Sequence, residues 1–282
     1  MARENAQTIQ VDGGTAAKLI EAYGEMIAAV EKNLVSAQIK NNNYINVVGG
    51  SVEVYRLQTA IVQAQGTART AMDGNRILRD PISVNKDTHK EIVERWKKNE
   101  AEQAGISSLI EKRRAAHQLA MVSALDTAFF AKAVEEGDEV VVTSKTTLIK
   151  RLNALVQAVE SIKNDYITNG VARAFLALTV TPSVYDELQD VIDTLPNPNG
   201  GGVGMDYYKG VRIFNNLNQT VDAICMPFES VAQPIDLLPY KQEDMELSPF
   251  TAVSTFFDFG TKAVMPELIK YATVLDEDEV SA

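Results

Sequence analysis

The stretch of this sequence that comes nearest to a known chemical motif is a loop of closely spaced glycines: Gly200, Gly201, Gly202 and Gly204. Glycine-rich loops allow backbone amides to approach a phosphate closely. However, no Lys-Ser or Lys-Thr pair follows these glycines, and Tyr207 stands at the third glycine position of the dinucleotide-binding pattern counted from Gly202. The pattern therefore predicts no nucleotide cofactor, and residues 196–206 are typical of a flexible surface loop.

Residues that could bind a metal or act as a nucleophile are few and widely spaced. The two histidines, His89 and His117, have no second soft ligand near them in the sequence, so a zinc site is not expected. A packed or half-exposed helix residue is the usual role for His117. The single cysteine, Cys225, lies in the apolar segment AICMPF, where thiols are generally inert. We therefore expect no cofactor, no metal and no enzyme activity; a site built from scattered Asp, Glu and Lys is the alternative.

Positively charged side chains gather in two places. The first is Lys112-Arg113-Arg114, in a predicted helix, where a solvated face is the ordinary meaning and contact with a neighbour's acids or with nucleic acid is the alternative. The second is the stretch from Ile61 to Asp80, which has little apolar periodicity and contains Arg69, Arg76 and Arg79; Arg56, shortly before it, is counted with them. Loops of this length in compact domains are usually functional or disordered, so this stretch is a candidate for a functional loop.

Composition limits the class of protein. The chain has 282 residues, 45% of them apolar and 23% charged, which is typical of a folded protein with a substantial core in one or two domains. Its formal net charge of -11 argues against a protein whose main task is to bind nucleic acid through a basic face. The single cysteine excludes an internal disulfide, and neither a membrane span nor a secretion signal is recognisable, so we expect a cytoplasmic product.

The longest periodic segment runs from Glu91 to Val134 and predicts one long amphipathic helix. A helix of about 30 residues is roughly 45 Å long. Gly105 interrupts the pattern early, at a cost of about 1 kcal/mol relative to Ala. A kink, or a separate first helix from Thr88 to Gln103, is therefore the alternative.

Before this helix, residues 41–87 look like an excursion that leaves the body of the protein and returns. Short strands are predicted at 44–48 and 51–57, separated by a Gly-Gly pair, and extended chain resumes at 81–84. Such an arm can bury its surface only against something else. A neighbouring subunit and a mobile lid over the same molecule are the two interpretations.

The remaining elements alternate between helices and strands. Gly137 is predicted to end the long helix as a left-handed cap. Helices are predicted at 15–37, 146–165 and 182–195, the last with Pro182 at its first position. Strands are predicted at 140–143, 174–181, 208–214, 223–228, 251–257, 261–264 and 267–275, and an acidic tail follows from Asp276.

This order of elements resembles the major capsid proteins of tailed bacteriophages, which have the α+β Hong Kong 97-type fold. The residues that carry the resemblance are SVEVYRL (51–57), ISVNKDTHKEIVERW (82–96), ALDTAFFAKAV (124–134), TPSVYDELQDVI (181–192), YYKGVRIFNN (207–216) and FFDFGTKAVMPELI (256–269). They cover most of the chain as diffuse patterns, without an invariant fingerprint.

The resemblance implies a division into domains. An N-terminal arm would occupy residues 1–40, and an extended β loop, 41–90, would overlie the adjacent subunit. A peripheral domain with the long helix would comprise 91–143 and 249–275. The axial α/β domain, 144–248, would surround the five- and sixfold contacts, with loop 196–206 facing the capsomer axis. Residues 276–282 would be an acidic tail.

The resemblance also implies a function. Copies of the chain would assemble into pentamers and hexamers of an icosahedral head shell that encloses double-stranded phage DNA, touching it non-specifically and without a membrane. The implied partners are a separate scaffolding protein and a portal, with decoration proteins left open. The protein would assemble in the cytoplasm of the host bacterium and reside in the virion. A soluble α/β ligand-binding or enzymatic domain with 41–87 as a lid, and a cargo-holding nanocompartment, are the alternatives.

Two expectations concern contacts between subunits. Some relatives join subunits through a lysine on the extended loop, but residues 41–85 contain no lysine, so this cross-link is not expected. Buried area should stabilise the shell instead. The candidate intersubunit residues are Arg56, Arg69, Arg76, Arg79, Trp96, Arg113, Gly200, Gly201, Gly202 and Gly204.

Overall fold

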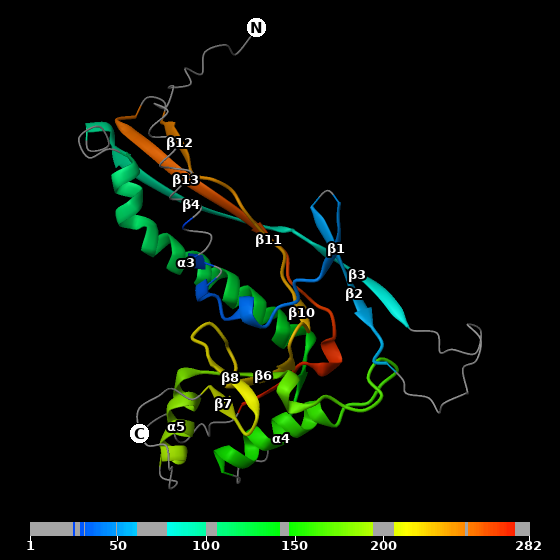
Figure 1. The fold of residues 1–282 in the computed structure, drawn as a ribbon. Helices are drawn as coiled ribbons and strands as arrows, with labels where there is room; N and C mark the ends of the chain where they lie inside the picture. The colour runs from blue at the N-terminus through cyan, green and yellow to red at the C-terminus, as the bar shows by residue number, and fades with distance from the viewer. Residues whose placement is uncertain are drawn as a thin grey trace. The chain divides into compact units, whose positions relative to one another are not determined.

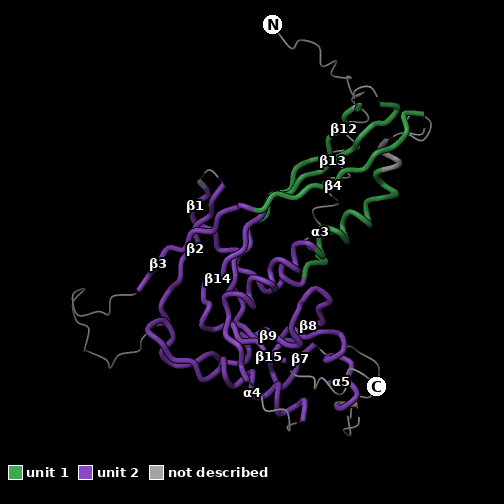
Figure 2. Tube along the Cα trace, turned by 180° about the vertical axis from the view of Figure 1, so that it is seen from behind, with its two compact units in different colours: residues 1–34, 88–123, 235–258 green, residues 35–87, 124–234, 259–282 purple. Residues whose placement is uncertain are grey.

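The computed structural model describes residues 25, 29–30, 32–48, 50–60, 78–99, 106–141, 147–193, 206–245 and 248–273. The chain divides into two compact units (Figure 2). Unit 1 comprises residues 1–34, 88–123 and 235–258, and unit 2 comprises residues 35–87, 124–234 and 259–282. Among the residues described, no helix is both long and apolar enough to cross a membrane.

Unit 1 is built on a β-sheet centred on strand β13 (Phe250–Phe259). This strand pairs with β4 (Thr88–Lys97), β11 (Ile235–Leu237) and β12 (Lys241–Asp244) (Figure 1). Burial alternates along β13, because every second residue from Thr251 to Phe259 is buried and those between are half-buried. The sheet therefore has one covered face.

The segment 88–97 is a strand, so the prediction of helix from Thr88 or Glu91 onward is wrong in this part. Ile92, Glu94 and Trp96 are half-buried, and the residues between them are exposed. That two-residue period belongs to a strand with one covered face. The sequence pattern does not reveal this strand, because Glu94, a charged residue on the covered face, breaks the expected alternation of apolar and polar residues.

Helix α3 (Ile106–Glu136) confirms the long helix, which starts directly after the interrupting glycine. The N–H of Gly137 donates to the carbonyl of Ala133 at 3.0 Å, but φ at Gly137 is not positive, so the predicted left-handed cap is wrong. A Cβ at this position would lie 2.7 Å from the Ala133 carbonyl oxygen and 2.9 Å from that of Ile269. Glycine is needed here because the backbones approach closely.

Unit 2 contains a six-stranded sheet in the order β5-β15-β9-β6-β8-β7. The strands are β5 (Asp138–Glu139), β6 (Leu176–Val180), β7 (Tyr207–Tyr208), β8 (Val211–Asn215), β9 (Ala223–Pro227) and β15 (Lys270–Ala272). The central strand β6 runs parallel to β8 and antiparallel to β9. Every residue of β6 and β9 is buried, as in strands covered on both faces.

Two apolar layers cover this sheet. On one face, helices α4 (Leu148–Glu160) and α5 (Pro182–Asp193) pack with Leu176, Leu178 and Val180. On the other face, Phe129 and Phe130 of α3 pack with side chains that include Ala177, Phe214 and Ile224. Unit 2 therefore has a helix–sheet–helix core.

A second sheet of unit 2 consists of β1 (Tyr44–Val48), β2 (Ser51–Leu57) and β3 (Arg79–Asn85), all antiparallel. Its inner face contributes Val54 and Val84 to a small cluster with Ala232 and Val264. Ala232 belongs to strand β10 (Val231–Ala232), and Val264 follows strand β14 (Lys262–Ala263), which pairs with β10. The described residues of unit 2 also form three short 3-10 helices: η1 (Ser36–Gln38), η2 (Arg173–Phe175) and η3 (Pro266–Leu268).

Several predicted elements agree with the structure and others are shifted. The strands at 44–48 and 51–57 and the start of α5 at Pro182 are confirmed. The helix predicted to reach Asp165 ends at Glu160. Of the strand predicted at 140–143, residues 140–141 lie outside any strand and residues 142–143 lie outside the described part of the chain, while β5 ends just before them at Glu139. Most of the helix predicted at 15–37 and the loop at 196–206 lie outside the described residues, apart from Asp206.

Candidate functional site

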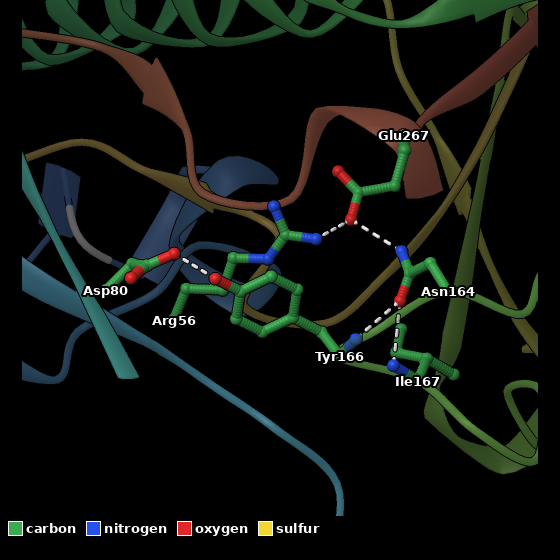
Figure 3. A network of polar contacts seen from close by, with 6 residues as sticks. All are labelled: Arg56, Asp80, Asn164, Tyr166, Ile167 and Glu267. Carbon is green, nitrogen blue, oxygen red and sulfur yellow. Dashed lines mark hydrogen bonds and ion pairs between the residues drawn. The ribbon is translucent and has the colours of Figure 1, made fainter. Parts of the chain in front are cut away.

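The best-defined polar site lies in unit 2, where strands β2 and β3 meet the segment that follows α4 (Figure 3). We call it the hairpin clamp; its residues are Arg56, Asp80, Asn164, Tyr166 and Glu267. Arg56 and Asp80 are placed opposite each other by the β2–β3 register. The clamp therefore joins residues from four separate stretches of sequence.

Arg56 is the centre of the clamp. Its guanidinium forms an ion pair with the carboxylate of Glu267 and lies over the ring of Tyr166, with Cζ 3.8 Å from the ring centroid. The side chains of Arg56 and Glu267 are 17% and 30% exposed, so the pair is partly shielded from water. A cation–π contact of this kind contributes about 0.5–1 kcal/mol at exposed sites and more when desolvated.

Tyr166 links the guanidinium of Arg56 to β3, the second strand of the β2–β3 hairpin. Its hydroxyl donates to a carboxylate oxygen of Asp80, and its ring supports Arg56 (Figure 3). The hydrogen bond to Asp80 raises the pKa of Tyr166, because losing the proton would place two negative charges side by side. The neutral phenol is therefore the form that stabilises the clamp.

Asn164 shapes the loop that presents Tyr166. Its side-chain oxygen accepts hydrogen bonds from the backbone N–H groups of Tyr166, at 3.0 Å, and Ile167, at 2.7 Å. Its side-chain nitrogen donates to Glu267 at 2.9 Å, to the same oxygen that pairs with Arg56. An Asn that bonds the backbone two residues on is a common way to fix a turn.

Backbone hydrogen bonds continue the clamp beyond the end of β2. The N–H of Thr59 donates to the carbonyl of Tyr166 at 2.8 Å. The side chain of Gln58 donates to the Asp165 carbonyl at 2.7 Å and accepts from the N–H of Leu78 at 3.2 Å. The base of the hairpin is thus held to loop 164–166 at several points.

The other end of the hairpin is fixed by a close approach of two backbones. A Cβ at Gly260 would lie 1.8 Å from the carbonyl oxygen of Asn85, which leaves room for glycine alone. Nearby, Lys262 Nζ donates to the Ser83 carbonyl at 3.1 Å and the N–H of Lys86 donates to the Gly50 carbonyl at 2.9 Å. The three-stranded sheet is therefore anchored at both ends within unit 2.

The segment before the hairpin is anchored by a buried carboxylate. Asp126 on α3 is 1% exposed and accepts hydrogen bonds from the N–H groups of Val35, at 3.1 Å, and Ser36, at 3.0 Å. It caps η1, whose own N-cap side chain makes no such bond. Burial raises the pKa of Asp126.

Unit 1 has a buried polar cluster of its own around His117. Nδ1 of His117 lies 2.8 Å from the hydroxyl of Tyr240, and Nε2 lies 3.2 Å from Glu94 Oε1. Burial raises the pKa of Glu94, but hydrogen bonds from Arg113 and His117 outweigh it and hold the pKa below its ordinary value. Burial raises the pKa of Tyr240 to about 12. His117 therefore has a packed role in the helix.

The contacts at these sites hold segments of the chain together. Among the described residues, no three His, Cys, Asp or Glu side chains come together as a metal site would require. Cys225 is fully buried, and burial raises the pKa of its thiol far above the ordinary value, so it is not a reactive nucleophile. The clamp holds a hairpin in place.

The candidate residues from the sequence are distributed differently. Arg56 is in the clamp, with its contacts in its own chain. Arg79 lies over the ring of Tyr55 at 3.4 Å, Trp96 is half-buried on β4, and Arg113 pairs with Glu94 at 2.7 Å. The following candidates lie outside the described residues: Arg69, Arg76, Gly200, Gly201, Gly202 and Gly204. Sequence reasoning missed the other four clamp residues, because their partners are remote in sequence: Asp80, Asn164, Tyr166 and Glu267.

Comparison with known proteins reveals a likeness of structure. No known protein-family profile matches the chain, and no curated protein sequence matches it. A chain of Mycobacterium phage Che8 superimposes with a TM-score of 0.57 at 14% identity, covering 80% of this chain and 85% of that one. The capsid of the cyanophage P-SCSP1u gives 0.55 at 12% identity, covering 84% and 85%. The virus-like particle from Pyrococcus furiosus gives 0.57 at 14% identity, covering 90% and 97%.

These three matches cover 80–90% of this chain and 85–97% of the matched chains. The chain therefore has the mixed α and β Hong Kong 97-type capsid fold that the sequence resemblance implied.

Proposed function

We propose that this chain, which has the Hong Kong 97-type capsid fold, is the repeating subunit of a capsid shell and acts by self-association. The observation that carries the proposal is the extent of the structural match, which covers 84% of the chain against the capsid of a cyanophage and 90% against a virus-like particle. A fold by itself does not fix a function. The molecule supplies a second argument, since the hairpin is anchored at its base while much of its surface is free.

The exposed apolar residues of the hairpin support a partner. Ile45, Val47 and Leu57 are 48%, 69% and 58% exposed on the three-stranded sheet. Strand β1 is also at an edge of that sheet. Exposed edges with apolar side chains invite pairing with another chain. A second copy is the partner that a shell supplies.

The finer picture is that of a tailed-bacteriophage head. We propose that copies close into pentamers and hexamers of an icosahedral shell, because heterologous contacts that repeat around a ring close it. The shell would enclose double-stranded DNA with non-specific contact, in keeping with the net charge of -11. A separate scaffolding protein and a portal would take part in assembly in the host cytoplasm, and decoration proteins are open.

The proposed domains and contacts follow the same scheme. Residues 41–90 would lie over the adjacent subunit, and 144–248 would face the capsomer axis with loop 196–206. Arg79, which is exposed on β3, is one of the described arginines that we propose to contact a neighbour. The undescribed candidates named above stay part of the proposal. Surface ion pairs contribute only about 0–1 kcal/mol each, so buried area would dominate.

A second candidate function is a cargo-holding nanocompartment. It is favoured by the virus-like particle from Pyrococcus furiosus, 97% of whose chain is covered. In both cases the chain would be structural rather than enzymatic. The contents of the particle distinguish them, because a phage head contains nucleic acid and a nanocompartment contains protein cargo.

Electron microscopy of the purified full-length chain, alone and with a co-expressed scaffold candidate, tests the proposal. Closed particles of uniform size are expected. A strictly monomeric protein whose hairpin amides are protected from exchange, and whose melting temperature rises with a small ligand, would support the lid interpretation instead. The deletion of residues 61–77 should abolish particles and leave a folded monomer.

A further inference from the structure

Strand β4 lies at an edge of the sheet in unit 1. Its only described strand partner is β13, and β12 pairs with the other edge of β13 (Figure 1). Helix α3 packs across one face of the sheet rather than along the free edge, because His117 of α3 contacts both Glu94 of β4 and Tyr240, which precedes β12. Strand β4, which is 10 residues long, therefore offers its outer edge to a partner.

The direction of the backbone groups of β4 follows from the hydrogen bonds of β13. The carbonyl of Phe256 accepts from the N–H of Leu238, next to β11, at 2.8 Å. Even-numbered residues of β13 therefore bond toward β11 and β12, and the odd-numbered ones bond toward β4. In agreement, the carbonyl of Pro249 accepts from the N–H of Lys98 at 2.8 Å, directly after β4.

A second contact gives the same register. His89 Nδ1 lies 2.8 Å from Asp258 Oδ1, and the residue numbers of this pair add up to the same value as those of Lys98 and Pro249. Even-numbered residues of β4 thus bond to β13 along the whole strand. The residues that direct N–H and C=O groups away from the sheet are the odd-numbered ones: His89, Glu91, Val93, Arg95 and Lys97.

The side chains on this outer edge are symmetric in charge about Val93. Glu91 lies two residues before Val93, and Arg95 lies two residues after it. All three side chains are exposed, Val93 to 48%. Neither charged side chain forms an ion pair with another residue of the described part of the chain. An antiparallel strand of the same sequence, centred on Val93, would therefore place Arg95 opposite Glu91 on both sides of the centre.

We propose that β4 pairs with the β4 strand of a second copy of this chain, antiparallel and about a twofold axis at Val93. The contact would join two sheets of unit 1 into one, through backbone hydrogen bonds from the odd-numbered residues of both strands. The two Val93 side chains would meet at the centre, with a Glu91–Arg95 ion pair on either side. Because both partners use the same surface, the contact is isologous.

The edge fits a second β4 better than it fits β1 or β12, which also lie at sheet edges. Strand β1 has no charged residue, and β12 has 4 residues against the 10 of β4. A register shifted by two residues would set Val93 opposite Glu91 or Arg95. Charged residues usually protect a sheet edge from pairing, whereas two opposite charges placed symmetrically favour one partner in one register.

The inference rests on the proposed self-association and adds a contact to it. Heterologous contacts that repeat around a ring close the ring, and an isologous contact can join one ring to the next. The paired β4 strands would be such a contact.

Disulfide trapping with one added cysteine tests the twofold pairing. In the full-length protein under assembly conditions, Val93→Cys should form a cross-linked dimer on mild oxidation, because the two Cα atoms would be about 5.5 Å apart. The wild type gives the background, since its Cys225 is fully buried. A dimer yield no higher than that of the wild type would overturn the proposal.

Glu91→Cys is the matched control on the same edge. In the proposed register each Glu91 faces Arg95, four residues from the second Glu91, so the two cysteines would be about 13 Å apart. Its dimer yield should be at least about tenfold lower than that of Val93→Cys. A mixture of Glu91→Cys and Arg95→Cys chains should form the dimer, because these positions face each other. Equal yields from Glu91→Cys and Val93→Cys alone would contradict the register.

Charge exchange provides the second arm. In the Val93→Cys chain, Glu91→Arg would set two arginines opposite each other on both sides of the axis, and should lower the dimer yield by about fivefold or more. Adding Arg95→Glu should restore the yield, because the pairs are then exchanged but still opposite in charge. Circular dichroism checks that both variants are folded. A yield that Glu91→Arg leaves unchanged, or that Arg95→Glu does not restore, would contradict the pairing.

Electron microscopy of the same samples separates this inference from the shell function. If particles form but Val93→Cys gives no dimer, the inference fails and the shell function stands. If the dimer forms but no particle does, the strand contact stands and the shell function fails.

Discussion

The two larger sheets of unit 2 differ in how they satisfy their own surfaces. The six-stranded sheet is covered on both faces, and its strands β6 and β9 are buried at every position. The three-stranded hairpin sheet has one small apolar cluster beneath it and exposes Leu57, Ile45 and Val47. The first needs no partner to be stable. The second is held by polar contacts at its ends and leaves a surface for another molecule.

This difference assigns folding stability mainly to one sheet and the surface for assembly mainly to the other. Buried apolar area contributes about 25 cal/mol per Å², so the six-stranded sheet provides most of the folding free energy of unit 2. The hairpin sheet adds little to folding but offers area for association. Substitutions in the two sheets should therefore separate loss of folding from loss of assembly.

The largest expected effect comes from two matched leucines. Leu178→Ala in β6 removes a side chain that is 0% exposed and should lower the free energy of unfolding by about 2–5 kcal/mol. Leu57→Ala in β2, where the side chain is 58% exposed, should change it by less than about 0.5 kcal/mol. Urea denaturation of unassembled protein measures both.

Particle yield completes that comparison. Leu57→Ala should reduce the yield of particles although the monomer is as stable as the wild type. Normal assembly of Leu57→Ala would contradict the idea that the hairpin surface is an interface.

A smaller effect is expected from the glycine that fixes the end of the hairpin. Gly260→Ala would force a Cβ to within 1.8 Å of the Asn85 carbonyl, so the backbones must separate at a cost of about 1–3 kcal/mol. Gly50→Ala is the control, because no atom lies within 4 Å of its added Cβ and only the φ of 91° opposes it. Thermal denaturation should rank Gly260→Ala below Gly50→Ala; the reverse order would mean that the close approach is not rigid.

The sequence predicted the self-contained sheet better than its surroundings. Strands with continuous apolar runs, such as AICMP in β9, and helices with clear caps, such as α5 at Pro182, carry their signal within a few residues. Strand β4 was misread as helix because its inward-facing Glu94 pairs with Arg113 on α3, a contact outside any local pattern. In β4, contacts with residues remote in sequence therefore outweighed the helical period of the apolar residues.

The hairpin clamp could not be predicted for a related reason. Arg56 and Glu267 are 211 residues apart, and Tyr166 and Asp80 are 86 apart, so residue spacing carries no trace of either contact. The sequence did single out Arg56, but as a residue facing a neighbouring subunit. The hint that was available is the Asn-Asp-Tyr run after α4, since Asn and Asp shape turns.

The pH dependence of stability tests the burial of Tyr208 in the six-stranded sheet. Burial raises the pKa of Tyr208 in the six-stranded sheet to about 12, whereas an unfolded tyrosine titrates near 10. The folded state therefore holds more protons between pH 10 and 12, and stability should fall as the pH rises through that window, by about 1–2 kcal/mol.

Tyr208→Phe tests this assignment. The variant loses hydrogen bonds to the Ile149 carbonyl and Asn153, so it should be less stable at pH 8. Its loss of stability between pH 10 and 12 should be smaller than that of the wild type. Urea denaturation at several pH values measures the two slopes, and identical slopes would show that Tyr208 is not responsible.

The smallest expected effect isolates the clamp from the rest of the hairpin. Arg56→Lys keeps the positive charge beside Glu267 but loses the flat guanidinium that lies over Tyr166, so unfolding should become easier by less than about 1 kcal/mol. The local effect should be clearer, because the Thr59 amide bonded to the Tyr166 carbonyl should exchange its hydrogen faster. Arg79→Lys is the matched control, since Arg79 also lies over a tyrosine, Tyr55, but outside the clamp. Faster exchange at Thr59 in both variants would mean that the hairpin loosens as a whole, and that loop 164–166 does not act as a separate anchor.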